Sequence, residues 1–261
     1  MPVFVLPADT ELGLSLVRAL RADGAQVHAY ATGDGDVGAL RATGAHVAVG
    51  DLDDIGRIES AMTGAHTVMA VQADPTWPDV DDLDVSLRTT LSAAVGAEVQ
   101  RIILRSVPGA ATDASDLLRH VCGRAEEAAR DVDVPTFVVR TSLVRTTRLR
   151  DGLASLAPRL RAAGTPIAPM SVDDLVTGLV ALDAARSTAT SGHALFVAHG
   201  QVTTLADELA GDHLDEGEGM VGRTWVAPDQ VPLLAPSLAT SWVDDDPIAA
   251  DLWELVRAGH E

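Results

Sequence analysis

The sequence predicts an α/β protein, with a Rossmann-like doubly wound parallel sheet and a small C-terminal α/β lobe. Short runs of apolar and β-branched residues alternate with longer stretches of helical periodicity up to residue 140. The first run, Val3–Leu6, is apolar at every position, as in a strand that is buried on both faces. Strands separated by helices of this length imply right-handed crossovers and a parallel sheet that is covered on both sides.

The expected elements follow one another along the first part of the chain. Residues 12–20 carry apolar side chains at helical spacing, and Gly24 is suited to ending that helix. The later helical stretch at residues 115–130 is ended by the segment that leads to Pro135, because proline cannot continue a helix. We expect strands at residues 3–6, 26–31, 46–49, 66–71, 101–104 and 136–140, and helices at residues 12–20, 56–62, 84–95 and 115–130.

The pattern changes after the sixth strand. We therefore predict a Rossmann-like domain over residues 1–142 and a lid or substrate lobe over residues 143–261 that packs on the same core. Ser171 and Asp174 have capping-box chemistry ahead of an apolar helical run, and Thr204 is expected to open another helix in the same way. A strand at residues 194–197, an exposed acidic loop at 212–219 and a terminal helix at 247–257 complete the predicted lobe.

The composition excludes several classes of function. The chain has 38 acidic and 19 basic residues and a formal charge of −19, which disfavours binding to nucleic acid or to an anionic membrane surface. It contains no lysine, and Tyr30 is its only tyrosine, so a Tyr-x-x-x-Lys proton relay is excluded. The single cysteine, Cys122, excludes an internal disulfide and a cysteine-rich zinc site.

The start of the sequence lacks the basic region and the small-residue cleavage site of a secretion signal. No apolar run approaches the roughly 18 residues that a membrane-spanning helix needs. We therefore expect a cytoplasmic protein whose partner is a small molecule, not a nucleic acid or a membrane. A homodimer is left open.

Short motifs spread over nearly the whole chain occur in a characteristic order. They are Leu12-Gly13 with the apolar run to Leu20, Gly50-Asp51-Leu52, residues 101–104 with Ser106, Glu126-Glu127 through Pro135 to Arg140, Ser171 to Asp174, and residues 204–209. This order resembles the atypical short-chain dehydrogenase/reductase superfamily, most closely its NmrA-like, NAD(P)H-binding branch. The resemblance implies a dinucleotide held at the turn after the first strand, and a catalytic tyrosine and lysine one helical turn apart.

The turn after the first strand departs from the Gly-x-x-Gly-x-x-Gly pattern that the resemblance implies. Gly13 is kept, but Pro7 and Thr10 stand at the other two glycine positions, and Pro7 has no N–H. Asp9 and Glu11 bring negative charge to the place of the phosphates. Asp9 or Thr10 would cap the helix and Asp9 or Glu11 would complement its dipole, and this ordinary capping argues against a cofactor equally well. We therefore expect no cofactor, unless NAD(P) binds in a non-standard way.

The loop after the second strand also lacks the residues that a bound dinucleotide would require. Proteins of this type place an acidic residue there for the ribose hydroxyls, or an arginine for the 2′-phosphate of NADP. Thr32 holds that position and Asp34 follows it, while no arginine lies between Arg21 and Arg41.

The resemblance places Leu118 and Cys122 where the catalytic tyrosine and lysine would lie. It places Val107 near the catalytic serine position, with Ser106 adjacent. Leucine and cysteine cannot form that proton relay. Cys122 is either a nucleophile facing the cleft or a small buried packing residue, and we favour the second interpretation.

A ligand pocket is expected where the carboxyl ends of the strands meet. Arg105, late in a strand, would either pair with a carboxylate at the top of the sheet, with Asp9 and Asp51 as candidates, or bind an anionic group of a ligand. No catalytic residue is assigned, and the candidates for acid–base or nucleophilic chemistry are Asp74, Ser106 and Cys122. The predicted pocket residues are Trp77, Arg105, Ser106, Val107, Leu118, Cys122, Arg140, Thr141 and Ser142.

Four aspartates between residues 79 and 84 are closely spaced, but they fit no calcium-loop pattern. We interpret Asp79, Asp81, Asp82 and Asp84 as residues that cap the following helix, and we expect no metal site.

The sequence as a whole favours a catalytically divergent short-chain dehydrogenase/reductase-like protein that binds a small, largely apolar molecule. It would act as a redox-independent cyclase, isomerase or dehydratase, or as an NmrA-type sensor. An NAD(P)-dependent oxidoreductase with a relocated proton donor is the alternative, and a purely structural partner within a complex is a third class.

Overall fold

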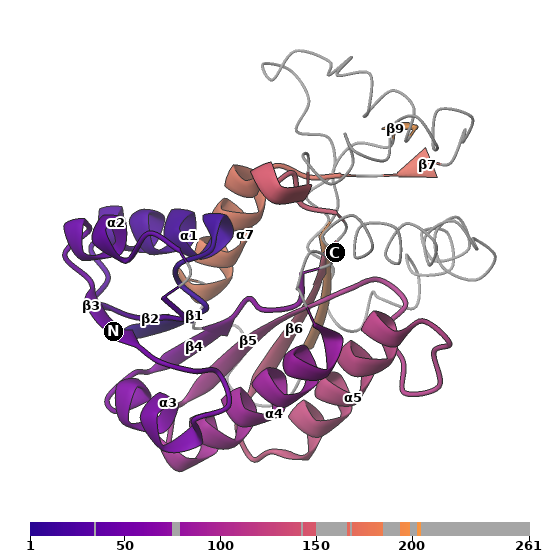
Figure 1. Ribbon diagram of the computed structural model, residues 1–261, viewed down its shortest axis with the longest axis horizontal. Helices are drawn as coiled ribbons and strands as arrows, with labels where there is room; N and C mark the ends of the chain where they lie inside the picture. Colours follow the sequence, from indigo (N-terminus) through magenta and orange to yellow (C-terminus); the bar gives the residue numbers. More distant parts are fainter. Residues whose placement is uncertain are drawn as a thin grey trace.

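The fold is built on one seven-stranded sheet, as a computed structural model shows (Figure 1). The structure describes residues 1–33, 35–74, 79–141, 143–149, 166–167, 169–184, 194–198 and 203–204. The strand order is β3-β2-β1-β4-β5-β6-β8, and every neighbouring pair is parallel. The strands are β1 (Val3–Leu6), β2 (Val27–Ala31), β3 (His46–Val49), β4 (Thr67–Ala70), β5 (Arg101–Ser106), β6 (Thr136–Thr141) and β8 (Ala194–Ala198).

The order of the strands reverses beside β1. The chain runs outward from β1 to β2 and β3, and then crosses back to β4, which pairs with the other side of β1. In doubly wound sheets, ligands bind beyond the carboxyl ends of the strands at such a switch point. The predicted doubly wound α/β fold is confirmed.

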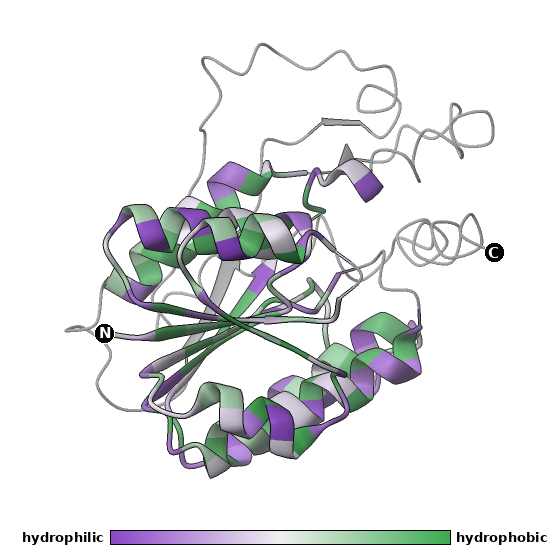
Figure 2. Ribbon diagram, turned by 60° about the vertical axis from the view of Figure 1, so that its left-hand side comes forward, coloured by the Kyte–Doolittle hydropathy of each residue, from purple (hydrophilic) through white to green (hydrophobic). Residues whose placement is uncertain are grey.

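Helices cover both faces of the sheet (Figure 1). One face carries α1 (Glu11–Ala22), α2 (Val37–Ala42) and α7 (Val172–Ala184), and the other carries α3 (Ile55–Met62), α4 (Val80–Gly96) and α5 (Leu117–Asp131). Each face has its own apolar core, and hydrophobic residues gather between the sheet and the helices (Figure 2). Burial on both faces explains why the strands read as continuous apolar runs.

Several elements differ from the sequence prediction. The short helix α2 was not predicted, and α4 begins four residues before the predicted start at residue 84. Thr204 lies in β9 (Thr203–Thr204), which pairs with β7 (Pro166–Ile167) in a separate antiparallel sheet, and the helix that it was expected to open lies outside the described residues. The predicted acidic loop at 212–219 and the terminal helix at 247–257 lie outside the described residues.

The helix α7 begins with the predicted capping chemistry. The hydroxyl of Ser171 accepts a hydrogen bond from the backbone N–H of Asp174 at 3.0 Å and donates one to its carboxylate at 2.9 Å. The helix then packs beside α1 on the sheet. None of the helices in the part of the chain that the structure describes is long and apolar enough to cross a membrane.

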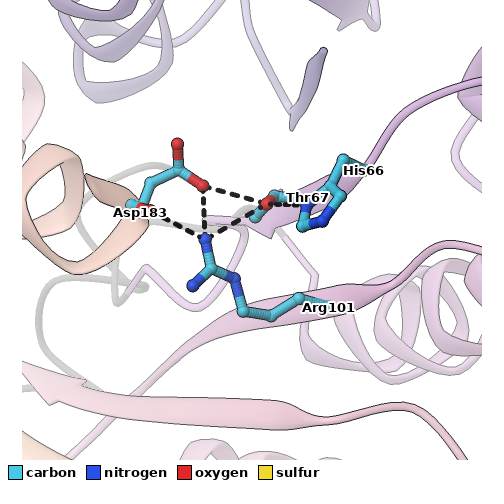
Figure 3. A network of polar contacts seen from close by, with 4 residues as sticks. All are labelled: His66, Thr67, Arg101 and Asp183. Atoms are coloured by element: carbon cyan, nitrogen blue, oxygen red, sulfur yellow. Dashed lines mark hydrogen bonds and ion pairs between the residues drawn. The ribbon is translucent and has the colours of Figure 1, made fainter. Parts of the chain in front are cut away.

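A buried ion pair joins the far end of α7 to the amino edge of the sheet (Figure 3). The Arg101 guanidinium, at the start of β5, lies 2.5 Å from the Asp183 carboxylate, which also accepts a hydrogen bond from Thr67 at the start of β4. The same guanidinium lies over the Phe137 ring, 5.6 Å from its centroid. Both charged side chains are only 5% exposed, so each depends on the other for its solvation.

We predict that Asp183→Asn lowers the free energy of unfolding by about 3–5 kcal/mol, because the substitution leaves the Arg101 charge buried without its counter-charge. Urea unfolding followed by circular dichroism measures the change. The control is Asp84→Asn, whose partners Arg88 and Arg124 are 52% and 46% exposed, and it should cost at most about 1 kcal/mol. Equal effects of the two substitutions would contradict the role of the buried pair.

Candidate functional site

The carboxyl edge of the sheet brings together four segments that are distant in sequence. β1 ends at Leu6, β4 at Ala70, β5 at Ser106 and β6 at Thr141, and these four strands are neighbours. The residues that follow them therefore meet at one edge, at the switch point between β1 and β4.

The turn from β1 to α1 is closely packed. The Thr10 hydroxyl caps α1 by accepting the Gly13 N–H at 3.0 Å, so Thr10 and not Asp9 is the capping residue. A Cβ at Gly13 would lie 2.1 Å from the Pro7 carbonyl oxygen, and only glycine allows this approach. Among the described residues, the backbone N–H groups of Glu11 and Leu12 find no acceptor. They are free donors at the positive end of the α1 dipole.

Asp9 binds the loop that follows β2. Its Oδ2 accepts hydrogen bonds from the Thr32 hydroxyl at 3.0 Å, the Gly33 N–H at 2.8 Å and the Gly35 N–H at 3.3 Å. Its Oδ1 is buried and, among the residues that the structure describes, has no hydrogen-bond partner. A Cβ at Gly35 would lie 1.9 Å from the Asp9 carbonyl oxygen, so the two turns pack backbone against backbone. Asp34 lies outside the described residues.

Glu11 lies in the first turn of α1, where its charge complements the helix dipole. Its Oε2 accepts a hydrogen bond from the backbone N–H of Thr147 at 2.7 Å. This contact joins the turn after β1 to the segment beyond β6, on the carboxyl side of the sheet.

Arg105 forms an ion pair at the sheet edge, but not with the expected partners. Its guanidinium lies 3.1 Å from the Asp74 carboxylate and donates a hydrogen bond to the Thr141 hydroxyl at 3.1 Å. The expected ion pair with a carboxylate at the top of the sheet is therefore present, but neither suggested partner, Asp9 or Asp51, forms it. Asp74 follows β4, the immediate neighbour of β5, whereas β1 and β3 lie further across the sheet. The Arg105 side chain is only 2% exposed.

A second polar cluster lies on the opposite face of the same strands. The Glu126 carboxylate, on α5, accepts hydrogen bonds from the Ser106 hydroxyl at 2.6 Å and from Arg140 at 2.8 and 2.9 Å. Arg140 also donates to the Ala110 carbonyl at 2.7 Å. The Glu126 side chain is 1% exposed, and its burial is compensated by the Ser106 hydroxyl and by two guanidinium groups, that of Arg140 and, at 3.6 Å, that of Arg130.

Glu126 was not predicted as a site residue, although the sequence contains a signal for it. It follows Cys122 by four positions and so lies on the apolar stripe of α5. A carboxylate on a buried stripe requires partners, and this requirement points to the strand ends that α5 covers.

The residues at the predicted positions of the catalytic pair are buried. Val107, Leu118 and Cys122 belong to one apolar cluster beneath α4 and α5. Burial, with a smaller contribution from the nearby Glu126 charge, raises the pKa of the Cys122 thiol to about 12. A buried, protonated thiol among apolar side chains agrees with the interpretation of Cys122 as a packing residue.

Tyr30, the only tyrosine, lies in β2 and is also buried. Its hydroxyl donates a hydrogen bond to the Asp51 carbonyl at 3.0 Å, and burial raises its pKa to about 12. It belongs to the side of the sheet away from β5 and β6, so it is not a replacement for the missing relay.

Other predicted residues have simpler positions. Asp79 caps α4 by accepting the Asp81 N–H at 2.8 Å, as the capping interpretation predicts. No group of three metal-ligating side chains occurs within the described ranges. Trp77 and Ser142 lie outside the described residues.

We predict that iodoacetamide does not modify Cys122 in the folded protein at pH 8. A pKa of about 12 leaves on the order of one thiol in ten thousand ionised at this pH, and the thiol is also buried. Mass spectrometry of native and urea-unfolded samples measures the reaction. Rapid alkylation of the native protein would support the nucleophile interpretation instead.

The raised thiol pKa also predicts the sign of a pH effect on stability. The folded state keeps the proton more strongly than the unfolded state, so the stabilisation is complete below the unfolded pKa of about 8.5. It is lost as the pH rises towards 12. The free energy of unfolding should therefore fall more steeply above pH 9 in the wild type than in Cys122→Ala.

Comparisons with known proteins give a family and a fold. Residues 8–172, well over half of the chain, match the family described as NAD(P)H-binding. A nucleoside-diphosphate-sugar epimerase from Staphylococcus aureus has a similar structure, with a TM-score of 0.65, 15% identity, and coverage of 99% of this chain and 90% of that one. No curated protein matches the sequence.

Two further similar structures contain NAD. The UDP-glucose 4-epimerase of Brucella ovis in complex with NAD has a TM-score of 0.62 and 16% identity, over 78% of this chain and 79% of that one. The UDP-glucose 4-epimerase of Thermus thermophilus in complex with NAD has a TM-score of 0.62 and 14% identity, over 100% and 99% of the two chains.

The family match overturns the expectation that no cofactor binds. That expectation weighed the missing N–H of Pro7, the side chain of Thr10 and the charges of Asp9 and Glu11, but not the backbone amides that remain at the start of α1, which can bind an anion. The close packing at Gly13 is intact, and the Glu11 and Leu12 amides are free, so the turn keeps the parts that hold a pyrophosphate. The chain belongs to the NAD(P)H-binding family of the atypical short-chain dehydrogenase/reductase superfamily.

Proposed function

We propose that this protein binds NAD(P)H at the N-terminus of α1, binds a small, largely apolar molecule beyond β4 to β6, and acts as an NmrA-type sensor instead of a reductase. The observation that carries the proposal is the burial of Leu118 and Cys122 at the positions of the catalytic tyrosine and lysine. Neither side chain can pass a proton to a carbonyl oxygen at neutral pH.

The cofactor half of the proposal rests on the α1 turn. The Glu11 and Leu12 amides can donate to a pyrophosphate, and the helix dipole favours an anion there. A nicotinamide cofactor supplies hydride chemistry when it is bound. The nearby carboxylates of Asp9 and Glu11 oppose the phosphate charge, so we expect modest affinity.

The ligand half rests on the groups at the strand ends. Val107 and Leu118 place buried apolar side chains, 2% and 5% exposed, where a reductase would carry its proton relay. Arg105 and Thr141 form a polar pair on the other face of β5 and β6, and such a pair can orient a bound molecule. Shape and apolar contact, with a few polar groups, would then select the ligand.

An NAD(P)-dependent oxidoreductase with a relocated proton donor is the second candidate. The Ser106 hydroxyl, beside the predicted serine position, forms a 2.6 Å hydrogen bond to the buried Glu126 carboxylate. A hydroxyl paired with a carboxylate can relay a proton. Oxidation of NADH with a panel of aldehydes and ketones distinguishes the candidates, since a sensor leaves the bound cofactor unchanged.

We predict that Glu11→Pro binds NADH about tenfold more weakly than Glu11→Ala, because proline removes one amide donor to a charged group. Both substitutions remove the carboxylate. Proline suits the first helical position, and Thr10 before it is extended with φ −78° and ψ 163°. Isothermal titration calorimetry measures the affinities. Equal affinities of the two variants for NADH would show that the Glu11 amide of α1 does not bind the cofactor.

We predict that Leu118→Trp abolishes binding of an apolar dye, 1-anilinonaphthalene-8-sulfonate, by filling the expected ligand space. Leu117→Trp is the matched control, since Leu117 is 45% exposed on the same turn of α5. Leu118→Trp should cost about 1–3 kcal/mol by overpacking, so melting curves must accompany the dye titration. Unchanged dye binding in a folded Leu118→Trp protein would place the ligand elsewhere.

A further inference from the structure

We propose that Asp9 makes the protein selective for NAD(H) over NADP(H). The proposal rests on the proposed function, because it concerns which dinucleotide the α1 turn accepts. The selecting carboxylate comes from the turn after β1, and not from the end of β2, where an acidic residue for the ribose ordinarily stands.

The first argument is that Asp9 already occupies the donors that a 2′-phosphate would need. The end of β2 and the loop after it direct three donors to one point: the Thr32 hydroxyl and the Gly33 and Gly35 amides. Loop amides that converge on one point in this way can bind an anion. Asp9 Oδ2 fills that site at 2.8 to 3.3 Å, so a 2′-phosphate would meet a resident carboxylate in place of free donors.

The second argument concerns the other carboxylate oxygen. Asp9 Oδ1 is buried and has no hydrogen-bond donor in the described part of the chain. Such an unsatisfied acceptor destabilises the folded protein unless a donor binds to it. A ribose 2′-hydroxyl is a donor, whereas the 2′-phosphate of NADP is a dianion that offers only acceptors. The same oxygen therefore attracts one cofactor and repels the other.

The third argument is the lack of a compensating cation in the sequence of this region. No arginine or lysine lies between Arg21 and Arg41. The Arg21 guanidinium donates to the carbonyls of Thr43 and Ala25, near the opposite end of α1. Asp36 adds another carboxylate as the capping residue of α2. Carboxylates are thus the charges that the structure shows on the loop after β2 and in the turn that meets it, while the Arg57 guanidinium lies beside Gly50, after β3.

Calorimetric titration of the full chain with NADH and NADPH tests this proposal. We expect the wild type to bind NADH at least about tenfold more tightly, since one hydrogen bond to a charged group is involved. In Asp9→Ser the three donors are released, and the ratio of the two affinities should fall to about one or reverse. Asp9→Asn removes the charge but keeps an acceptor, so its ratio should lie between those of wild type and Asp9→Ser.

Glu11→Gln is the matched control, because it removes a carboxylate of the same turn. Both dinucleotides carry the same pyrophosphate, so this variant should change both affinities by the same factor. Melting curves identify any Asp9 variant that fails to fold, and the wild-type ratio stands independently of the variants.

Equal wild-type affinities, or tighter binding of NADPH, would overturn the role of Asp9 while leaving the proposed cofactor site in place. An Asp9→Ser protein that is folded and keeps the wild-type ratio would do the same. Failure of the wild type to bind either dinucleotide at millimolar concentration would overturn the proposed function together with this inference.

Discussion

The parallel arrangement of all seven strands is the constraint on which the rest of the structure depends. Because both faces of the sheet are covered, the strand interiors must be apolar, and polar side chains gather where the strands end. Each polar group at the carboxyl edge then needs a partner from a neighbouring strand or helix. Asp9 accepts hydrogen bonds from the loop after β2, Arg105 forms an ion pair with Asp74, and Glu126 accepts a hydrogen bond from Ser106.

These partnerships limit the chemistry that the edge can perform. An arginine and a carboxylate that neutralise each other in a buried site hold their positions but give no free acid or base. The proton relay expected of the superfamily would start from α5, where the structure has only a leucine and a thiol with a raised pKa. What remains is a set of backbone donors at α1 and an apolar surface, which suits recognition better than reduction.

The fold could be predicted from the sequence because β-branched runs and helical spacing are local signals. The predicted bounds of the strands in the main sheet lie close to the observed ones. The helix α2 is too short for its periodicity to be visible in the sequence, and the pairing of β7 with β9 depends on contacts between distant residues. At the site, side-chain identity predicted the loss of the relay but misled about the cofactor, since amide donors have no sequence signature. The partner of Arg105 could not be predicted without the strand order, which places β4 and not β1 beside β5.

The central claim is that backbone amides at the start of α1 hold a dinucleotide although two of the three expected glycines are missing. A crystal structure grown with a saturating concentration of NADH tests it most directly. The account predicts pyrophosphate oxygens within hydrogen-bond distance of the Glu11 and Leu12 amides. A dinucleotide bound elsewhere, or no bound dinucleotide at saturation, would contradict it.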